Sequence, residues 1–264
     1  MIPVFAGFGS PWPFFTYTQN ITQVLVPNTE GGAVLGVTWS LAVEDQFYLI
    51  LPFIIYYVPP KRLLGCLLLF IASSTVFRLA MWYWGPRQGW AGYVLLPCRW
   101  DSLFMGVLGA WLTRQPRFMC WLRDNRWAFY GLMFIIGMII TILRVERQGN
   151  LMYFGMHMLG FLCLAIFYLS LILLVLADKE NWLAKFFSMR WLCGLGLISY
   201  GVYIFHQPVS WLLHTLAGNA EPTMLNWRDV GITMAALFVT VSIAAASWKI
   251  FESKMVRWGR RHTY

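Results

Sequence analysis

Two adjacent carboxylates and a carboxamide, Glu44, Asp45 and Gln46, stand in an otherwise apolar and aromatic stretch, TWSLAVEDQFY, that spans residues 38–48. The apolar residues continue to Val58, so these polar groups lie one turn inside the end of a predicted membrane helix. An ionised side chain costs about 3 kcal/mol at the centre of a membrane helix. A carboxylate kept in such a helix can orient a histidine or bind a sugar hydroxyl, so the stretch predicts a functional site.

Further polar residues interrupt three other apolar segments. Arg78, Arg99, Asp101 and His206 each lie toward the same predicted side of the membrane as the carboxylate pair. Tyr203 precedes His206 by three residues and shares its helix face. We expect these side chains to converge on a water-filled cavity, where pairing and hydration lower the cost of burial.

The chemistry open to such a cluster is limited. An imidazole can remove a proton from a hydroxyl, and a guanidinium can hold an anion or a developing oxyanion. Transfer of an acyl group to an alcohol needs these parts. A proton-coupled transporter would use the same residue types, so both classes stay open.

The charged residues also have simpler explanations. Glu44 and Asp45 could be first-turn acids favoured by the helix dipole, which contributes about 0.3–1 kcal/mol. The long side chain of Arg78 could extend to the outer surface of the membrane and place its guanidinium in water. Arg99 and Asp101 point to different helix faces and are expected to pair with residues on other helices rather than with each other.

The histidines divide by context. His206 could be a satisfied core histidine, but it follows Tyr203 and precedes Pro208, which weakens the helical hydrogen bonding just after it. His157 and His214 have no such neighbours and are interpreted as structural.

The composition indicates a membrane protein. Of 264 residues, 59% are hydrophobic and 12% are charged, whereas soluble domains carry about 25% charged residues. The net charge is +9, but Lys and Arg cluster at the ends of apolar segments, which argues against a nucleic-acid-binding protein. The five cysteines form no C-x-x-C pair, and no metal site is expected.

We predict an all-α, polytopic transmembrane bundle with about seven spans. Each span needs roughly 20 mainly apolar residues. The predicted segments are Ser40–Val58, Leu63–Trp84, Tyr93–Thr113, Trp127–Leu143, Leu151–Ala177, Trp191–Ala217 and Val230–Trp248. Pro97 is expected to bend the third segment.

Loop charges predict the orientation. Fourteen Lys and Arg residues fall on one face and four on the other, so the first face is predicted to be cytoplasmic. Residues 1–264 are predicted to form a single domain in a plasma (inner) membrane. Residues 1–39 would be an outer loop that can include the remnant of a helix, 178–189 an amphipathic helix, and 249–264 a cytoplasmic basic tail.

Three stretches, in this order along the chain, resemble the acyltransferase-3 family of membrane O-acyltransferases. Residues 38–49 (TWSLAVEDQFYL) resemble its TWSLxxEEQFYL signature, and residues 99–106 (RWDSLFMG) its R-x-D-x-x-x-x-G helix. Residues 198–208 (ISYGVYIFHQP) resemble iSYxxYLxHxP. Residues 247–254 (SWKIFESK) resemble the closing SYxxxExP element without its proline.

The resemblance implies a bundle of about ten helices that moves an acyl group, commonly acetyl from acetyl-coenzyme A, to a hydroxyl of an envelope glycan or other carbohydrate. The donor would be cytoplasmic and the acceptor would lie outside. Membrane lipid surrounds such a protein, and no metal is implied.

One departure concerns the family's first helices. Family members begin with about three more helices, the first of which carries an arginine and, eleven positions on, the histidine assigned as catalytic base. The first histidine here is His157, in a different helix. The chain is therefore expected to be the C-terminal portion of a family member, N-terminally incomplete. It would be a truncated gene product, the product of a wrongly assigned start, or one part of a split protein that takes those helices in trans. We expect that it does not turn over alone.

The predicted site follows from these motifs. Glu44, His206 and Arg99 are the expected catalytic residues. The expected substrate-binding residues are Asp101, Tyr203, Trp39 and Arg78. The alternative hypothesis is a non-catalytic homologue that acts as a scaffold or a transporter-like protein.

Overall fold

The structure is a computed structural model that describes residues 10–26, 35–87, 89–145, 153–219, 222, 224 and 226–260. The predictions for residues 1–9 and for the last four residues of the tail fall outside this described part. Within it every regular element is helical, as the sequence predicts. The chain forms two compact units: a core unit of Pro11–Pro27 and Trp39–Phe187, and a helix-pair unit of Met1–Ser10, Asn28–Thr38 and Ser188–Tyr264.

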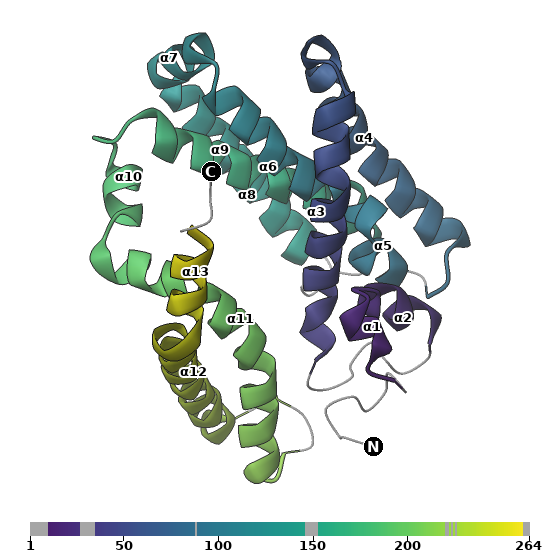
Figure 1. Ribbon diagram of the computed structural model, residues 1–264, viewed down its shortest axis with the longest axis vertical. Helices are drawn as coiled ribbons and strands as arrows, with labels where there is room; N and C mark the ends of the chain where they lie inside the picture. Colours follow the sequence, from purple (N-terminus) through teal and green to yellow (C-terminus); the bar gives the residue numbers. More distant parts are fainter. Residues whose placement is uncertain are drawn as a thin grey trace. The chain divides into compact units, whose positions relative to one another are not determined.

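The core unit begins with two short helices and is then built on longer ones (Figure 1). α4 packs against α6, α6 against α9, and α9 against α8. The elements in order are α1 (Trp12–Phe15), α2 (Gln19–Leu25), α3 (Trp39–Tyr57), α4 (Pro60–Trp84), α5 (Trp90–Val94), the 3₁₀ turn η3 (Leu96–Arg99), α6 (Trp100–Thr113), α7 (Pro116–Asp124), α8 (Arg126–Val145), the π-helical turn η4 (Met156–Gly160), α9 (Phe161–Ala177) and α10 (Trp182–Phe187).

Aromatic packing holds α3, α4 and α6 together. The rings of Phe70 and Phe104 stack with centroids 4.5 Å apart, and Phe47 meets Phe104 edge-on at 5.1 Å. Phe104 is fully buried. Burial of a large side chain of this kind contributes about 1.5–3 kcal/mol, so this aromatic group fixes how α3 and α6 approach each other.

The third predicted span is not one continuous helix, which corrects the prediction for Tyr93–Thr113. Pro97 has no N–H to donate to the preceding turn, and the chain folds as α5, an extended residue at Leu95, and the turn η3 before α6 begins. α6 has 14 residues and is about 21 Å long, shorter than the hydrocarbon core of about 30 Å. The break places Arg99 at the N-cap of α6 and Asp101 in its first turn.

The helix-pair unit consists mainly of α11 (Arg190–Leu216) packed along α12 (Trp227–Ser247). A 3₁₀ turn, η2 (Gly36–Thr38), packs on α11. α12 continues through the π-helical turn η5 (Trp248–Glu252) into α13 (Ser253–Arg260). Gly201 on α11 lies where α12 comes close, since a Cβ there would be 3.1 Å from the Ala244 Cβ.

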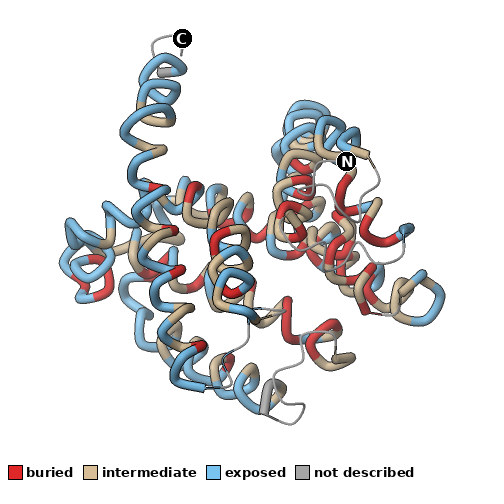
Figure 2. The backbone as a smooth tube through the Cα atoms, turned by 90° about the horizontal axis from the view of Figure 1, so that it is seen from below, coloured by how far each residue is buried: buried red, intermediate tan, exposed pale blue. Residues whose placement is uncertain are grey.

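Each predicted span is helical over most of its length, but the count of seven spans is not confirmed. Among the described residues, four helices are long and apolar enough to cross a membrane by themselves: Pro60–Trp84, Arg126–Leu143, Met156–Ala177 and Trp227–Gly259. Figure 2 colours long stretches of the backbone as exposed. The exposed large apolar side chains on these helices include Phe134 at 72% and Phe238 at 75%. Apolar surface on all sides is typical of a helix in lipid, and the protein is a membrane protein. The amphipathic helix predicted for 178–189 is shorter than expected, since only α10 is helical there.

Candidate active site

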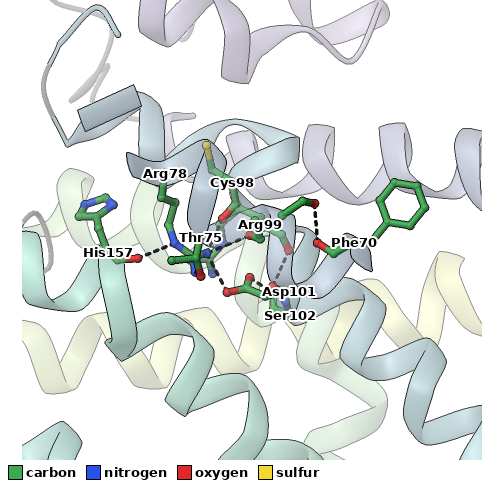
Figure 3. Close-up of polar contacts among 10 residues, drawn as sticks. Phe70, Thr75, Arg78, Cys98, Arg99, Asp101, Ser102 and His157 are labelled. Atoms are coloured by element: carbon green, nitrogen blue, oxygen red, sulfur yellow. Dashed lines mark hydrogen bonds and ion pairs between the residues drawn. The ribbon is translucent and has the colours of Figure 1, made fainter. Parts of the chain in front are cut away.

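Arg78 lies at the centre of a buried polar cluster in the core unit (Figure 3). Its side chain, on α4, has no exposed surface. Its Nε donates to the His157 carbonyl at 2.6 Å, and its Nη1 donates to the Cys98 carbonyl at 2.7 Å. Its guanidinium also donates to the hydroxyls of Ser74 and Thr75, each at 3.0 Å. Arg78 therefore does not extend outward, and it joins α4 to η3 and η4.

Asp101 is the counter-ion of Arg78. The Arg78 Nη1 and the Asp101 Oδ2 are 2.7 Å apart, and both side chains are fully buried. The Asp101 Oδ1 accepts the backbone N–H of Ser102 at 2.8 Å. The prediction that Asp101 pairs with a residue on another helix is confirmed. Both carboxylate oxygens are engaged within the protein.

Arg99 stands next to this pair but belongs to a different environment. Its guanidinium carbon lies 4.7 Å from the ring centroid of Phe161, 5.5 Å from that of Tyr93 and 6.0 Å from that of Trp39. Its buried Nη1 makes no hydrogen bond to any described residue. Cation–π contacts contribute about 0.5–2 kcal/mol. Removal of a charge from water costs several kcal/mol, so these contacts alone do not compensate for burial of the guanidinium.

The charges in this cluster do not balance. Two guanidinium groups face one carboxylate, and Arg78 takes that carboxylate. Among the described residues of the core unit, no acidic side chain forms an ion pair with Arg99. A partly buried cation without an ion-pair partner favours an anion, or an oxygen that becomes negative during a reaction.

His157 is a member of the cluster that the sequence did not indicate. It is fully buried in η4, and neither ring nitrogen has a hydrogen-bond partner among the described residues. Its ring centroid lies 5.5 Å from that of Trp82, and a Cβ at Gly92 would come within 3.0 Å of its Nδ1. No sequence motif marks His157, because its place depends on how η4 packs against α4 and α5.

Glu44 projects from α3 on a face separate from the cluster. The Tyr48 hydroxyl donates to the Glu44 Oε1 at 2.8 Å, so the two residues share a face of α3. Glu44 is exposed in the core unit, whereas Val43 and Phe47 are buried. Within the described core unit, no hydrogen bond or ion pair joins Glu44 to Arg78, Arg99 or Asp101.

Gln46, in the same stretch, anchors the short N-terminal helices. Its Nε2 donates to the Tyr17 carbonyl at 2.6 Å and to the Asn20 Oδ1 at 3.0 Å. The fully buried Asn20 in turn donates to the Val94 carbonyl at 3.2 Å. The polar residues of this stretch thus have different roles. Gln46 helps to join α2, α3 and α5 through Asn20.

Tyr203 and His206 belong to α11 of the helix-pair unit. The Tyr203 hydroxyl donates to the Val37 carbonyl at 3.0 Å, and the Gln207 Oε1 accepts the Val37 N–H at 2.9 Å. His206 is exposed, and its Nδ1 lies 2.6 Å from the Tyr203 carbonyl. One turn of α11 therefore binds both the backbone N–H and the backbone carbonyl of Val37, which lies two residues before α3 begins.

The interpretation of His214 as structural is supported by its contacts. It is fully buried, its Nε2 lies 3.1 Å from the Thr233 hydroxyl, and its Nδ1 lies 3.1 Å from the Asn219 amide nitrogen. The same amide donates to the Asp229 Oδ1 at 2.9 Å. This network ties the ends of α11 and α12 together.

A hollow beside Arg99 completes the geometry. It lies between α6 and α9 and has a volume of about 240 Å³. Its lining residues are Arg99, Ser102, Met105, Gly106, Phe161, Leu164, Ala165, Tyr168, Leu169 and Ile172. The unpartnered guanidinium therefore borders a space that is otherwise largely apolar. No group of three or more His, Cys, Asp or Glu in the described part of the chain is placed to hold a metal ion.

Comparison with known proteins decides the family. The profile of the acyltransferase-3 family, described as an acyltransferase domain, matches residues 1–248. The chain belongs to the acyltransferase-3 family. Peptidoglycan O-acetyltransferase OatA of Listeria monocytogenes is 27% identical over 225 residues, which are 81% of this chain and 34% of OatA.

Other relatives of this acyltransferase-3 protein are also named as O-acetyltransferases. A Staphylococcus aureus (strain COL) protein named "Putative O-acetyltransferase" is 25% identical over 219 residues, which are 74% of this chain and 33% of that protein. The same values are found for its counterpart in strain N315. The chain thus spans about one third of the length of these relatives, and no solved structure matches it. Family membership supports an acyltransferase enzyme and confirms the resemblance seen in the motifs.

Proposed function

We propose that the protein is a membrane O-acyltransferase that moves an acyl group, acetyl or longer, from acyl-CoA to a hydroxyl of an envelope glycan. The observation that carries the proposal is Arg99, a guanidinium without a counter-ion beside an apolar hollow in a family of acyltransferases. OatA, by its name, acetylates peptidoglycan, which supports a glycan acceptor.

The proposed reaction is a direct transfer. The acceptor hydroxyl oxygen attacks the thioester carbonyl carbon, and a C–O bond forms while the C–S bond breaks. The hydroxyl proton passes to a base, for which Glu44 or His206 is the candidate, and then to the departing thiolate. Arg99 would donate to the carbonyl oxygen of the thioester, on which the negative charge forms when the hydroxyl attacks, and a charged donor is most effective there.

The other predicted residues would support this step. Trp39 lies against Arg99 through its ring and can orient the guanidinium. Arg78 and Asp101, expected from the sequence to bind substrate, engage each other, so we assign them a positioning role at the start of α6. Tyr203, whose hydroxyl donates to the Val37 carbonyl, would order the segment that precedes α3 in the sequence.

The loop charges support an orientation in the inner membrane with the C-terminus in the cytoplasm. The donor would then approach from the cytoplasm and the glycan from outside. The requirement for N-terminal helices in trans remains a prediction from the resemblance, and co-expression of such a segment with this chain tests it.

Transfer of labelled acetyl from acetyl-CoA to envelope glycan tests the function, measured in membranes that contain the protein together with the N-terminal helices that the family resemblance implies. We expect Arg99→Gln to lower the rate about 10²–10³-fold, the range for loss of an oxyanion donor. Arg62→Gln, at the first turn of α4 and far from the cluster in sequence, is the matched control. Equal rates for Arg99→Gln and the unchanged protein would refute the role of Arg99.

A non-catalytic role, as a scaffold or a transporter-like protein, is the second candidate. It is favoured because, among described residues, Glu44 is hydrogen-bonded to Tyr48 and no base contacts Arg99. Proton-dependent uptake or efflux without any covalent product would support it, and acyl transfer would exclude it.

A further inference from the structure

The hollow beside Arg99 has the form of a short groove. Along α9 its lining extends from Phe161 to Ile172, eleven residues or about 16 Å. Tyr168 and Ile172 are 57% and 54% exposed, so the end away from Arg99 is open at the surface of the core unit.

Small residues on α6 create the space. At Gly109 the two helices touch, since a Cβ there would lie 2.7 Å from the Leu169 Cδ1. At Gly106, one turn earlier, a Cβ would meet nothing within 4 Å. The groove is therefore an open interval next to a close helix contact, and it ends at Arg99.

The lining selects the chemistry of an occupant. Only Arg99, Ser102 and Tyr168 contribute polar side chains, and Arg99 and Ser102 lie near the start of α6. A sugar or a nucleotide would lose its hydrogen bonds with water over most of this length, at a cost of about 1–3 kcal/mol for each unsatisfied group. An unbranched apolar chain loses none.

The size of the groove favours a chain longer than acetyl. The hollow has a volume of about 240 Å³, and its lining along α9 extends about 16 Å. An acetyl group would fill only a small part of it, whereas a longer unbranched chain would continue toward its open end.

We propose that this groove between α6 and α9 holds the hydrocarbon chain of the transferred acyl group, with its carbonyl oxygen at Arg99. The protein would then accept unbranched acyl groups longer than acetyl, such as hexanoyl and octanoyl, in addition to acetyl. This inference depends on the proposed transfer reaction for its biological meaning, but occupancy of the groove can be measured without turnover.

The first experiment compares acyl-CoA donors from acetyl to dodecanoyl with the membrane-embedded protein. Gly106→Leu places a side chain in the open space, and Gly137→Leu, on α8, is the matched control because a Cβ there also meets nothing within 4 Å. We expect Gly106→Leu to lower the ratio of hexanoyl and octanoyl transfer to acetyl transfer by about tenfold or more, as misfits in apolar pockets do. An unchanged chain-length profile would overturn the inference.

The second experiment does not require activity. Octanoyl-CoA with a diazirine at the end of its chain is photolysed with the protein, and the labelled peptides are identified by mass spectrometry. Labelling of α6 and α9 that is lost in Gly106→Leu and kept in Gly137→Leu supports the groove, whereas labelling elsewhere overturns it. Failure of all transfer together with labelling of the groove would refute the proposed function and leave the binding site standing.

Native mass spectrometry separates an acyl donor from a membrane lipid. A phospholipid that stays bound in the unchanged protein, is lost in Gly106→Leu and is not displaced by octanoyl-CoA would show that the groove belongs to lipid, and the inference would be wrong.

Discussion

The Arg78 Nη1 and the Asp101 Oδ2 form an ion pair of 2.7 Å in which neither side chain has any exposed surface. This pair connects α4 to the first turn of α6, next to the residue that carries the uncompensated charge, Arg99. Because Arg78 also binds two backbone carbonyls, the pair fixes the path of η3 and η4. The position of Arg99 thus depends on the neighbouring Arg78–Asp101 pair, whose charged groups are bonded within the protein.

Removal of the Asp101 charge should destabilise the protein strongly. In Asp101→Asn the buried Arg78 guanidinium loses its counter-ion, and a broken buried pair costs about 3–5 kcal/mol. Thermal unfolding in detergent measures the loss. The control is Asp178→Asn, which breaks the exposed 3.5 Å pair with Arg126, where about 0–1 kcal/mol is expected. Equal losses in the two variants would contradict the structural role of the Arg78–Asp101 pair.

Substitution of Arg99 should separate stability from activity. Arg99→Gln removes a partly buried charge that has no ion-pair partner among the described residues, so the free energy of unfolding should stay the same or rise. Acyl transfer should fall in the same variant. A large loss of stability, comparable with that of Asp101→Asn, would show that Arg99 is structural. Thermal unfolding and the transfer assay on one preparation give both quantities.

Tyr203 should order the segment before α3. Tyr203→Phe removes the hydrogen bond to the Val37 carbonyl, whose net contribution is about 0.5–1.5 kcal/mol. Hydrogen exchange at residues 35–38 should become faster. Ser199→Ala on the same helix is the control, because among the described residues the Ser199 hydroxyl donates only to the Gly196 carbonyl of its own helix. Equal exchange in both variants would contradict the contact.

Two glycines of α11 should respond to alanine with opposite signs. Gly196→Ala meets open space and should stabilise the helix, by up to about 1 kcal/mol. At Gly201 the new Cβ would lie 3.1 Å from the Ala244 Cβ and 3.3 Å from its Cα, so α12 must move. Gly201→Ala should therefore gain less or lose stability in thermal unfolding. The same gain at both positions would show that α11 and α12 do not pack closely there.

The sequence alone determined the class, the helical segments and the family. Long apolar segments with basic ends predict membrane helices because lipid satisfies no backbone hydrogen bonds, and each of the seven predicted segments is largely helical. The residues 38–49, 99–106 and 198–208 were sufficient to indicate the acyltransferase-3 family, which the family profile confirms.

Only the tertiary structure decided which polar residues meet. The separation of Arg78 and Asp101 by a loop and a proline-broken helix hides their pairing, and nothing in the sequence around His157 or Asn20 shows that they are buried. Nor could local periodicity show that Arg99 has no carboxylate partner among the described residues, because the tertiary structure pairs Asp101 with Arg78 instead. Sequence patterns indicate which segments are apolar enough for lipid. Which side chains pair depends on the distances between helices, and the local preferences of each segment do not specify those distances.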